Sequence, residues 1–147
     1  MNMILNNRGE VYILTCVIIL IVLIMFSLIF TYISINVQIE NERRMIETEL
    51  ENYLTSKAET LFGSLKKGYI SLEEIKAYNY SDEVLEYIDV VCPENMKVFN
   101  VKTSQDTENG IEITLNCDFE IIYSVFSKPY TYEGKLKIKV SYIPIMN

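Results

Sequence analysis

The stretch VYILTCVIILIVLIMFSLIFTYISI, residues 11–35, decides how this chain folds. Its 25 residues include no charge, proline or glycine, and its polar groups are mainly hydroxyls such as those of Thr15, Ser27 and Thr31. About 20 apolar residues, each rising ~1.5 Å, cross the ~30 Å hydrocarbon core of a bilayer. Only a helix pairs all backbone polar groups of one isolated segment in lipid. The sequence therefore predicts one transmembrane helix over 11–35 with the lipid bilayer as a partner; the alternative is the buried core helix of a soluble protein.

Composition narrows the functional classes. The 147 residues leave room outside this helix for one small domain. A net charge of -7 argues against a nucleic-acid partner and against a polybasic membrane-surface role. Without histidine the chain lacks an imidazole base and the commonest zinc ligand, and it has no glycine-rich phosphate loop. We therefore expect no enzyme, no catalytic residue, no metal or cofactor, and no small-molecule substrate.

Residues 1–10 form a short polar leader with one cation, Arg8. The apolar run exceeds the 7–15 residues of a secretory signal peptide, and no small-x-small cleavage site follows it in 36–39. We therefore expect the helix to remain as a signal anchor. Arg8 on one side and Arg43 with Arg44 on the other leave the orientation undecided by the positive-inside rule.

Residues 36–67 continue the helix in amphipathic form. Neither proline nor glycine occurs between Gly9 and Gly63, which predicts one helix of about 50 residues. Gly68 is expected to end it, with Lys66 and Lys67 placed favourably for the helix dipole. The apolar stripe, at spacings of three and four, is Ile46, Leu50, Tyr53, Leu54, Ala58, Leu61, Phe62 and Leu65.

Residues 68–147 predict a small α+β domain. Ser71 and Glu74 form a capping box that opens one short helix, and Ser81 is expected to cap a second helix that stops before Pro93. Strands are predicted over 96–102 and from Ile111 onward, separated by a polar loop over 103–110, and in the final segment. The predicted fold class is α+β, with a long N-terminal transmembrane helix, one or two short helices and a small antiparallel sheet of about three strands.

The last two strands have complementary polar faces, one acidic and one basic. Opposite charges across a ladder contribute roughly 0.2–1 kcal/mol per pair. A turn near Ser127-Lys128-Pro129 would set the pairs Glu120–Lys135, Asp118–Lys137, Asn116–Lys139, Phe119–Leu136 and Cys117–Ile138. We interpret this charged array as a solvated sheet face rather than a binding site.

Cys92 and Cys117 leave two alternatives open. A bridge between them would close about 26 residues and contribute on the order of 3 kcal/mol in the chain-entropy model. The other alternative is two separate buried thiols, since Cys117 lies inside an expected strand and a bridge requires Cys92 beside it.

The layout resembles that of pilin-like proteins. The residues that carry the likeness are Asn7-Arg8-Gly9-Glu10-Val11-Tyr12, Gly68-Tyr69-Ile70-Ser71 and the last two alternating strands. The chain most closely resembles TadE-like minor pilins and related proteins of unknown function from Gram-positive mobile elements. This resemblance implies a single-pass protein of the cell membrane, with a cytoplasmic N-terminus and an extracytoplasmic C-terminal domain. It also implies other pilin-like or envelope-apparatus proteins as partners in a surface appendage, secretion or conjugation apparatus.

The leader departs from the prepilin pattern at one position. Prepilins are cut after a glycine, and many carry a glutamate at the fifth residue beyond the cut. If Gly9 is that glycine, Glu10 comes first after the cut and the fifth residue is Leu14. Gly9 and Glu10 are thus either a processing site or an interfacial flank of the helix. Two functions remain accordingly: a pilin-like subunit, or a membrane-anchored extracytoplasmic binding or adaptor module that does not enter a filament.

We expect Glu120→Ala and Lys137→Ala each to change the free energy of unfolding by less than about 1 kcal/mol, as exposed charges usually do. Chemical denaturation of the two variants measures this. Loss of folding in either variant would show that these side chains face the core.

Overall fold

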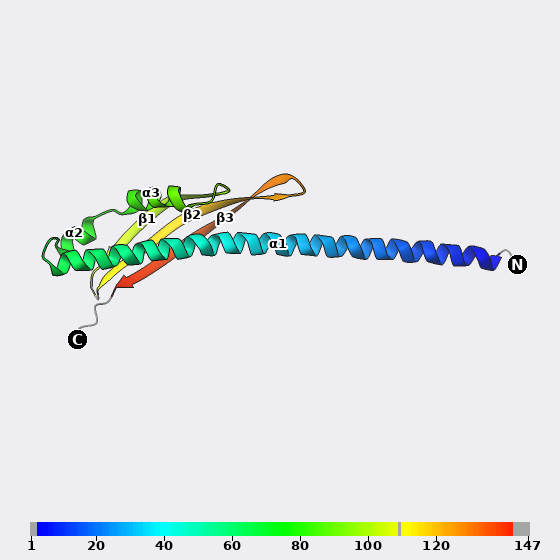
Figure 1. Ribbon diagram of the computed structural model, residues 1–147, viewed down its shortest axis with the longest axis horizontal. Coiled ribbons are helices and arrows are strands. Elements are labelled where there is room, and N and C mark those ends of the chain that lie inside the picture. The colour runs from blue at the N-terminus through cyan, green and yellow to red at the C-terminus, as the bar shows by residue number, and fades with distance from the viewer. Residues whose placement is uncertain (1–2, 109, 143–147) are drawn as a thin grey trace. The chain divides into compact units, whose positions relative to one another are not determined.

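Figure 1 shows the computed structural model, which describes residues 3–108 and 110–142, with side chains described from Gly9 onward. The elements are α1 (Met3–Lys66), α2 (Leu72–Ala77), α3 (Ser81–Val91), β1 (Met96–Asp106), β2 (Ile111–Val125) and β3 (Lys128–Tyr142). The chain divides into two compact units, Met1–Gln38 and Ile39–Asn147, and α1 contributes to both. The predicted layout of a long apolar helix, two short helices and a three-stranded antiparallel sheet is confirmed.

Helix α1 spans 64 residues and is longer than the predicted 50, because much of the polar leader is also helical. It ends as predicted at Gly68, whose φ of 73° lies in the left-handed region. The amide of Gly68 donates to the carbonyl of Leu65 at 3.0 Å, and that of Tyr69 donates to Ser64 at 3.0 Å. These two bonds are the Schellman pattern, which pairs the last helical carbonyls and turns the chain sharply.

The second half of α1 carries the predicted apolar stripe. Every residue predicted for the stripe is buried or half-buried. The fully buried side chains of the helix, each less than 9% exposed, are Ile39, Ile46, Leu50, Leu54 and Ala58. Burial of this stripe against the rest of the domain explains why the helix persists beyond its apolar half.

The two short helices begin differently. Helix α2 has the predicted capping box: Ser71 Oγ accepts from the Glu74 amide at 3.2 Å, and Glu74 Oε2 accepts from the Ser71 amide at 2.7 Å. The prediction for Ser81 is wrong, because Tyr80 is the N-cap of α3 and makes no side-chain capping bond. Asn79 Oδ1 accepts from the Ser81 amide at 3.0 Å instead, and Ser81 is buried with its hydroxyl 3.4 Å from that of Thr103.

The sheet has the strand order β1-β2-β3, and both pairings are antiparallel. One face is buried and the other is open. The buried side chains on β2 are, as predicted, Ile111, Ile113, Leu115, Cys117, Phe119 and Ile121. Together with Leu136, Ile138 and Val140 of β3 they form a core with the buried side chains of the helices, in which the rings of Tyr53 on α1 and Tyr87 on α3 stack at 4.4 Å.

Strand β1 extends further than predicted: residues 103–106, which the sequence assigned to a loop, belong to it. The pairing with β2 shifts between Phe99 and Lys102, and Asn100 has a φ of 53°. This bulge inserts one residue and reverses which face the later side chains occupy. The alternation in the sequence is therefore broken in the middle of the strand, and a simple period-two pattern misses its second half.

The predicted hairpin register is wrong by two residues. Phe126 and Ser127 both have positive φ, 48° and 62°, as in the two-residue type I′ turn that suits twisted hairpins. The turn is therefore tighter than predicted. The observed pairs are Asp118–Lys135, Asn116–Lys137, Cys117–Leu136, Phe119–Gly134 and Glu120–Glu133. A shift of two residues leaves each side chain on the same face of the sheet. The predicted core face and open face are therefore right, although the predicted cross-strand pairs are wrong.

Cys92 and Cys117 are free thiols in the structure, which is the second of the two alternatives that the sequence leaves open. Cys92 Sγ donates to the carbonyl of Met96 at 3.3 Å, and Met96 pairs with Ile121. Cys117 lies four residues away from Ile121 along β2, roughly 13 Å at ~3.3 Å per residue. A disulfide requires Cα atoms within about 7 Å, so this arrangement does not bring Cys92 and Cys117 close enough for a bridge.

We expect Gly134→Ala to lower the free energy of unfolding by roughly 1–3 kcal/mol, the usual cost of overpacking a core. A Cβ at this position would meet the Phe119 ring at 2.4 Å, and Phe119 is only 2% exposed. Thermal unfolding of the full chain in detergent measures the change. Gly63→Ala is the matched control, because nothing lies within 4 Å of that Cβ and alanine favours a helix. Equal stability of the two variants would contradict the packing argument.

Candidate functional site

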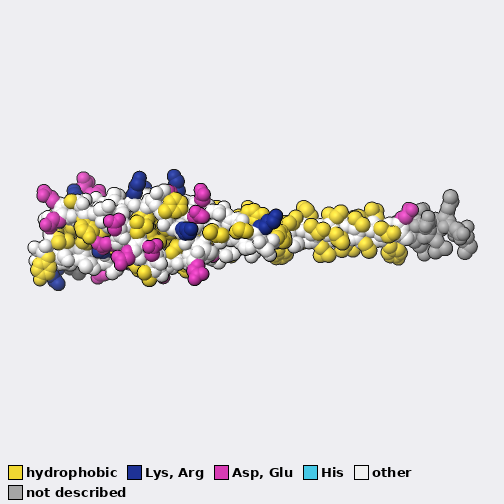
Figure 2. All heavy atoms as spheres, turned by 90° about the horizontal axis from the view of Figure 1, so that it is seen from above, with side chains coloured by type: hydrophobic (Ala, Val, Ile, Leu, Met, Phe, Trp, Pro, Cys, Tyr) yellow, Lys and Arg dark blue, Asp and Glu magenta, His cyan; other side chains and the backbone are white. Residues whose placement is uncertain are grey.

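The first candidate is the apolar surface of α1. No charged residue occurs over 11–39, and the large side chains over 11–33 are exposed, with Tyr12 at 73% and Phe30 at 70%. Figure 2 shows hydrophobic side chains covering the visible face of this part of the helix. Within the described residues, α1 is the helix whose length and composition would let it cross a membrane.

Three polar side chains of this stretch bond back to their own helix. The hydroxyl of Thr15 donates to the Val11 carbonyl at 2.8 Å, and that of Thr31 donates to Ser27 at 2.9 Å. Asn36 Nδ2 donates to the Tyr32 carbonyl at 2.9 Å. Side chains paired in this way add little polarity to the surface, which suits a hydrocarbon environment.

The predicted processing residues Gly9 and Glu10 both lie inside α1. No atom lies within 4 Å of a Cβ placed on Gly9. Cleavage between these two residues stays a prediction.

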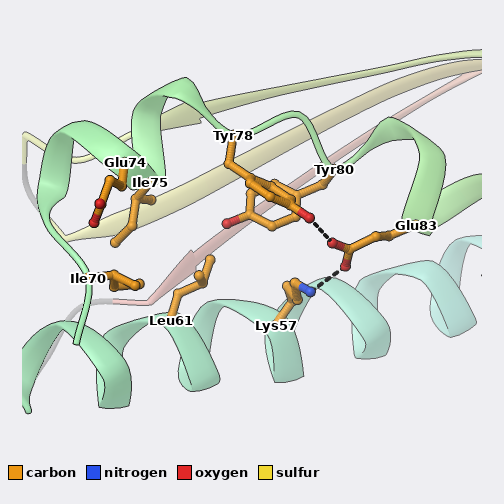
Figure 3. Close-up of a pocket in the computed structure, with 8 residues that line it drawn as sticks. All are labelled: Lys57, Leu61, Ile70, Glu74, Ile75, Tyr78, Tyr80 and Glu83. Atoms are coloured by element: carbon orange, nitrogen blue, oxygen red, sulfur yellow. Dashed lines mark hydrogen bonds and ion pairs between the residues drawn. The ribbon is translucent and has the colours of Figure 1, made fainter.

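The second candidate is a cavity of about 220 Å³ in the folded domain. Three consecutive segments of the chain build its wall, namely the second half of α1, the segment around α2, and the start of α3. The lining residues are Lys57, Leu61, Ile70, Glu74, Ile75, Tyr78, Tyr80 and Glu83 (Figure 3). The walls are mostly apolar. Lys57, Tyr78 and Glu83 gather at one end of the cavity, and Glu74 lies beside Ile75 at the other end (Figure 3).

Local sequence signals place these side chains. The turn at Gly68 reverses the chain after α1, and the capping box then starts α2 three residues later. Ile75 of α2 is buried at 1% exposure and anchors this segment. The segment from Gly68 to Tyr80 therefore does not pack directly against α1 along its whole length, and a space remains between them.

The polar end of the cavity is a connected network. Lys57 Nζ forms an ion pair with Glu83 Oε2, and the hydroxyl of Tyr78 donates to Glu83 Oε1 at 2.6 Å. The bond from Lys57, and then that from Tyr78, lower the pKa of the Glu83 carboxyl below its usual value. Lys57 also lies 5.2 Å from the centre of the Tyr80 ring, in a cation–π position. This carboxylate is thus held ionised and already paired, which suits a structural role better than that of a general base.

Tyr80 contributes the one uncommitted polar group that the cavity shows among the described residues. Its side chain is 3% exposed, and its hydroxyl makes no hydrogen bond within the described part of the chain. In Figure 3 this hydroxyl points away from Glu83 and toward the apolar walls. Burial raises the pKa of Tyr80 to about 12, so the phenol is neutral at physiological pH and can donate or accept. The cavity can therefore hold an apolar group that carries one hydrogen-bonding atom.

Sequence reasoning missed this cavity. Lys57 and Glu83 are separated by 26 residues, and no local pattern relates them. The local signal is a pair of tyrosines, Tyr78 and Tyr80, in the segment between the two short helices. The centres of their rings lie 4.6 Å apart. Within residues 3–108 and 110–142, no group of three or more acidic, histidine or cysteine side chains could hold a metal ion.

No protein-family model, curated protein or solved structure matches this chain.

We expect Glu83→Gln to lower the free energy of unfolding by roughly 1 kcal/mol at pH 7, because the charge-assisted bonds from Lys57 and Tyr78 are weakened. A carboxyl whose folded pKa lies below the unfolded value of 4.5 stabilises the fold above that pH, and the effect is lost as the pH falls through the folded pKa. The difference between wild type and variant should therefore shrink below pH 4.5.

Chemical denaturation at pH 7, 5 and 3.5 tests this dependence. Glu86→Gln on the exposed side of α3 is the matched control and should leave stability unchanged at each pH. A deficit in Glu83→Gln that stays constant with pH would contradict the assignment.

Proposed function

We propose that this chain is a pilin-like, TadE-like membrane-anchored subunit of a surface appendage, secretion or conjugation apparatus. In this proposal residues 11–35 of α1 lie in the cell membrane, the N-terminus is cytoplasmic and the domain from Ile39 onward is extracytoplasmic. The observation that carries the proposal is the long, largely exposed apolar surface of α1 over 11–35.

The energetics of that surface support a membrane location. The largest apolar patch on a soluble monomer is usually about 300–600 Å². A helix whose side chains are exposed and apolar on all sides for 25 residues exceeds that range, because each large side chain adds tens of Å². On the insertion scale, Leu, Ile, Phe and Val each favour the bilayer centre by about 0.3–0.6 kcal/mol, so a segment of this composition inserts strongly.

The first charged residues after the apolar surface support placing the end of the membrane segment just before them. Glu40 is paired with Arg43 at 3.4 Å and with Arg44 at 2.9 Å. The bond from Arg44 is the main reason that the pKa of Glu40 is lowered. A charged, internally paired turn is suited to the interface between lipid and water, where polar side chains remain hydrated.

The continuous backbone of α1 supports a subunit of an assembly. In the resemblance to pilin-like proteins, one helix provides both the membrane segment and the spine of the outer domain, and α1 has this continuity from Met3 to Lys66. The surface over 11–35 contains no glycine or alanine, so helices of different copies would pack through large aliphatic side chains.

A second function is favoured by the cavity. Tyr80 is almost completely buried as a residue, and its neutral hydroxyl faces the apolar walls of the cavity, where it is suited to bind part of a partner molecule. On this basis the alternative is a membrane-anchored extracytoplasmic binding or adaptor module that does not enter a filament.

The intact mass and N-terminal sequence of the protein from its native membranes distinguish the two functions. A chain that begins at Glu10 would indicate prepilin-type processing and favour the assembling subunit. A chain that begins at Met1 would favour the permanently anchored adaptor.

We expect the double substitution Ile21→Lys with Ile24→Lys to move the protein from the membrane fraction to the soluble or degraded fraction. Each lysine at the centre of a span costs roughly 2.5–3.5 kcal/mol on the insertion scale. Sedimentation after alkaline carbonate extraction measures the distribution. Asn52→Lys with Thr55→Lys, at exposed positions in the second half of α1, is the matched control and should stay with the membrane pellet. A wild-type chain released by carbonate would overturn the anchoring itself.

A further inference from the structure

The hairpin formed by the end of β2 and the start of β3 extends beyond the rest of the sheet. The ladder between β1 and β2 ends at the pair Met96–Ile121, followed by one bond from the Ile122 amide to the Asn95 carbonyl at 2.7 Å. Within the described part of the chain, residues 122–131 then pair only with each other. We call residues 122–131 the hairpin tip. Figure 1 shows this hairpin, in yellow and orange, projecting beyond β1 and α3.

The hairpin tip is apolar and aromatic, yet much of it is exposed. Phe126 is 73% exposed, Tyr130 is 47% exposed and Ile122 is 37% exposed. Lys128 is the one charged residue that the sequence contains over 121–132. Tyrosine is enriched where a bilayer meets water, and a lysine there keeps its ammonium group hydrated while its stem lies along apolar groups. The composition of the tip is therefore that of a segment suited to the interfacial layer of a membrane.

The turn at the end of the tip holds a bulky apolar side chain where the backbone disfavours one. Phe126 has a φ of 48°, and turns of this type are usually made with asparagine and glycine. A bulky residue at positive φ is a genuine outlier. Because the ring is mostly exposed, packing within the described part of the domain does little to offset this backbone cost. An outlier of this kind is a reason to assign a function to the side chain.

Two contacts show how β2 runs beside the second half of α1. The ring of Tyr142, at the end of β3 that pairs with the start of β2, has its centre 5.2 Å from that of the Phe62 ring. At the other end, Asn95 accepts the bond from the Ile122 amide and donates to Glu42 at 2.9 Å. Strand β2 therefore runs from the Phe62 end of α1 toward the Glu42 end, and the hairpin tip continues in that direction.

The tip extends past the residue at which α1 leaves the outer domain. The four residues from Ile122 to Phe126 lengthen a strand by about 13 Å, at ~3.3 Å per residue. The three residues from Glu42 back to Ile39, where this unit begins, cover about 4.5 Å of helix, at ~1.5 Å per residue. The tip therefore reaches several Å beyond Ile39, on the side of the outer domain from which the apolar stretch of α1 emerges.

We propose that the hairpin tip lies in the interfacial layer of the membrane that α1 spans, with the Phe126 ring among the lipid headgroups and the upper acyl chains. The inference rests on the proposed membrane anchoring and adds a second lipid contact to it. Glu40 is the first charge after the apolar stretch, so the membrane segment ends next to Ile39 and a tip that reaches beyond Ile39 meets the membrane surface. Burial in lipid removes the exposed Phe126 ring from water, which the protein fold alone does not do.

The nearest acidic residues limit how deep the hairpin enters. Glu120 and Glu133 face each other across the two strands, and ionised carboxylates are costly in hydrocarbon. Glu120 precedes Phe126 by six residues, which is about 20 Å of strand at ~3.3 Å per residue. The tip can therefore enter the interface while these carboxylates stay in water. With α1 and the tip both held by lipid, the outer domain is no longer free to turn about the axis of α1.

Tryptophan fluorescence of the full chain in phosphatidylcholine vesicles tests the contact. The chain contains no tryptophan, so a single introduced indole reports only on its own surroundings. Bromine atoms on the acyl chains quench an indole that touches them. The Phe126→Trp variant should lose about half of its emission when the bromines lie close to the headgroups, and less when they lie near the chain ends, because indole prefers the interface. Tyr69→Trp is the matched control: Tyr69 is 76% exposed in the turn after α1, and its emission should not change.

A second variant separates lipid contact from folding of the hairpin. Asparagine suits a positive φ, so Phe126→Asn should keep the turn and leave the thermal unfolding temperature equal to that of wild type or higher. With Tyr130→Trp as the reporter, the added Phe126→Asn substitution should reduce quenching by bromines about twofold or more, because the tip has lost its largest apolar group. Unchanged quenching would show that Phe126 does not hold the tip in lipid.

The outcomes also separate this inference from membrane anchoring. A Phe30→Trp variant reports on the apolar stretch of α1 in the same vesicles. Quenching of Phe30→Trp without quenching of Phe126→Trp would overturn the lipid contact of the tip and leave the anchoring intact, whereas absence of quenching in both would contradict the proposed function. Emission of Phe126→Trp at short wavelength without quenching would show that protein covers the tip instead of lipid. Equal quenching of Tyr69→Trp would show that the tip has no special contact.

Discussion

The structure depends on one constraint, which is that a single backbone helix serves two different environments. Over 11–39 no residue of α1 carries a charge, and from Ile46 onward its apolar side chains narrow to one stripe. Neither proline nor glycine interrupts the helix between Gly9 and Gly63, so the backbone hydrogen bonds continue across the change. The change of side-chain pattern near Glu40, rather than any break in the backbone, divides the chain into its two units.

The outer domain is small and is held mainly by packing between the stripe of α1, helix α3 and one face of the sheet. Leu54, Ala58, Ile113 and Leu115 have no exposed surface, and burial of such side chains contributes about 1.5–3 kcal/mol for each large one. Polar links also join the layers. Lys57 of α1 pairs with Glu83 of α3, and Asn95 Nδ2 donates to both carboxylate oxygens of Glu42 at 2.9 Å. These partly buried links select one arrangement of the helix on the domain more than they add to its stability.

The regular elements decide where the charged side chains of this domain gather. Helix α3 carries only acidic charges, whereas the open face of the sheet carries the lysines of β3 beside the acidic residues of β2, with Asp118 across from Lys135 and Glu112 bound to Lys139. Alternation on a strand and helical periodicity each place like charges on one surface, and the two-layer fold then sets those surfaces back to back. The cavity beside α1 is a separate feature that a binding partner could use.

The sequence by itself determined the elements whose signal is local. Unbroken hydrophobicity predicted α1, the glycine and capping box predicted its end and the start of α2, and alternation predicted the two faces of β2 and β3. Tertiary structure decided what depends on distant residues or on one backbone angle. The positive φ of Asn100 reverses the alternation of β1, and those of Phe126 and Ser127 set a register two residues away from the predicted one. The cavity arises in the same way, because Lys57, Ile75 and Glu83 belong to three helices and only the packing of those helices brings them together.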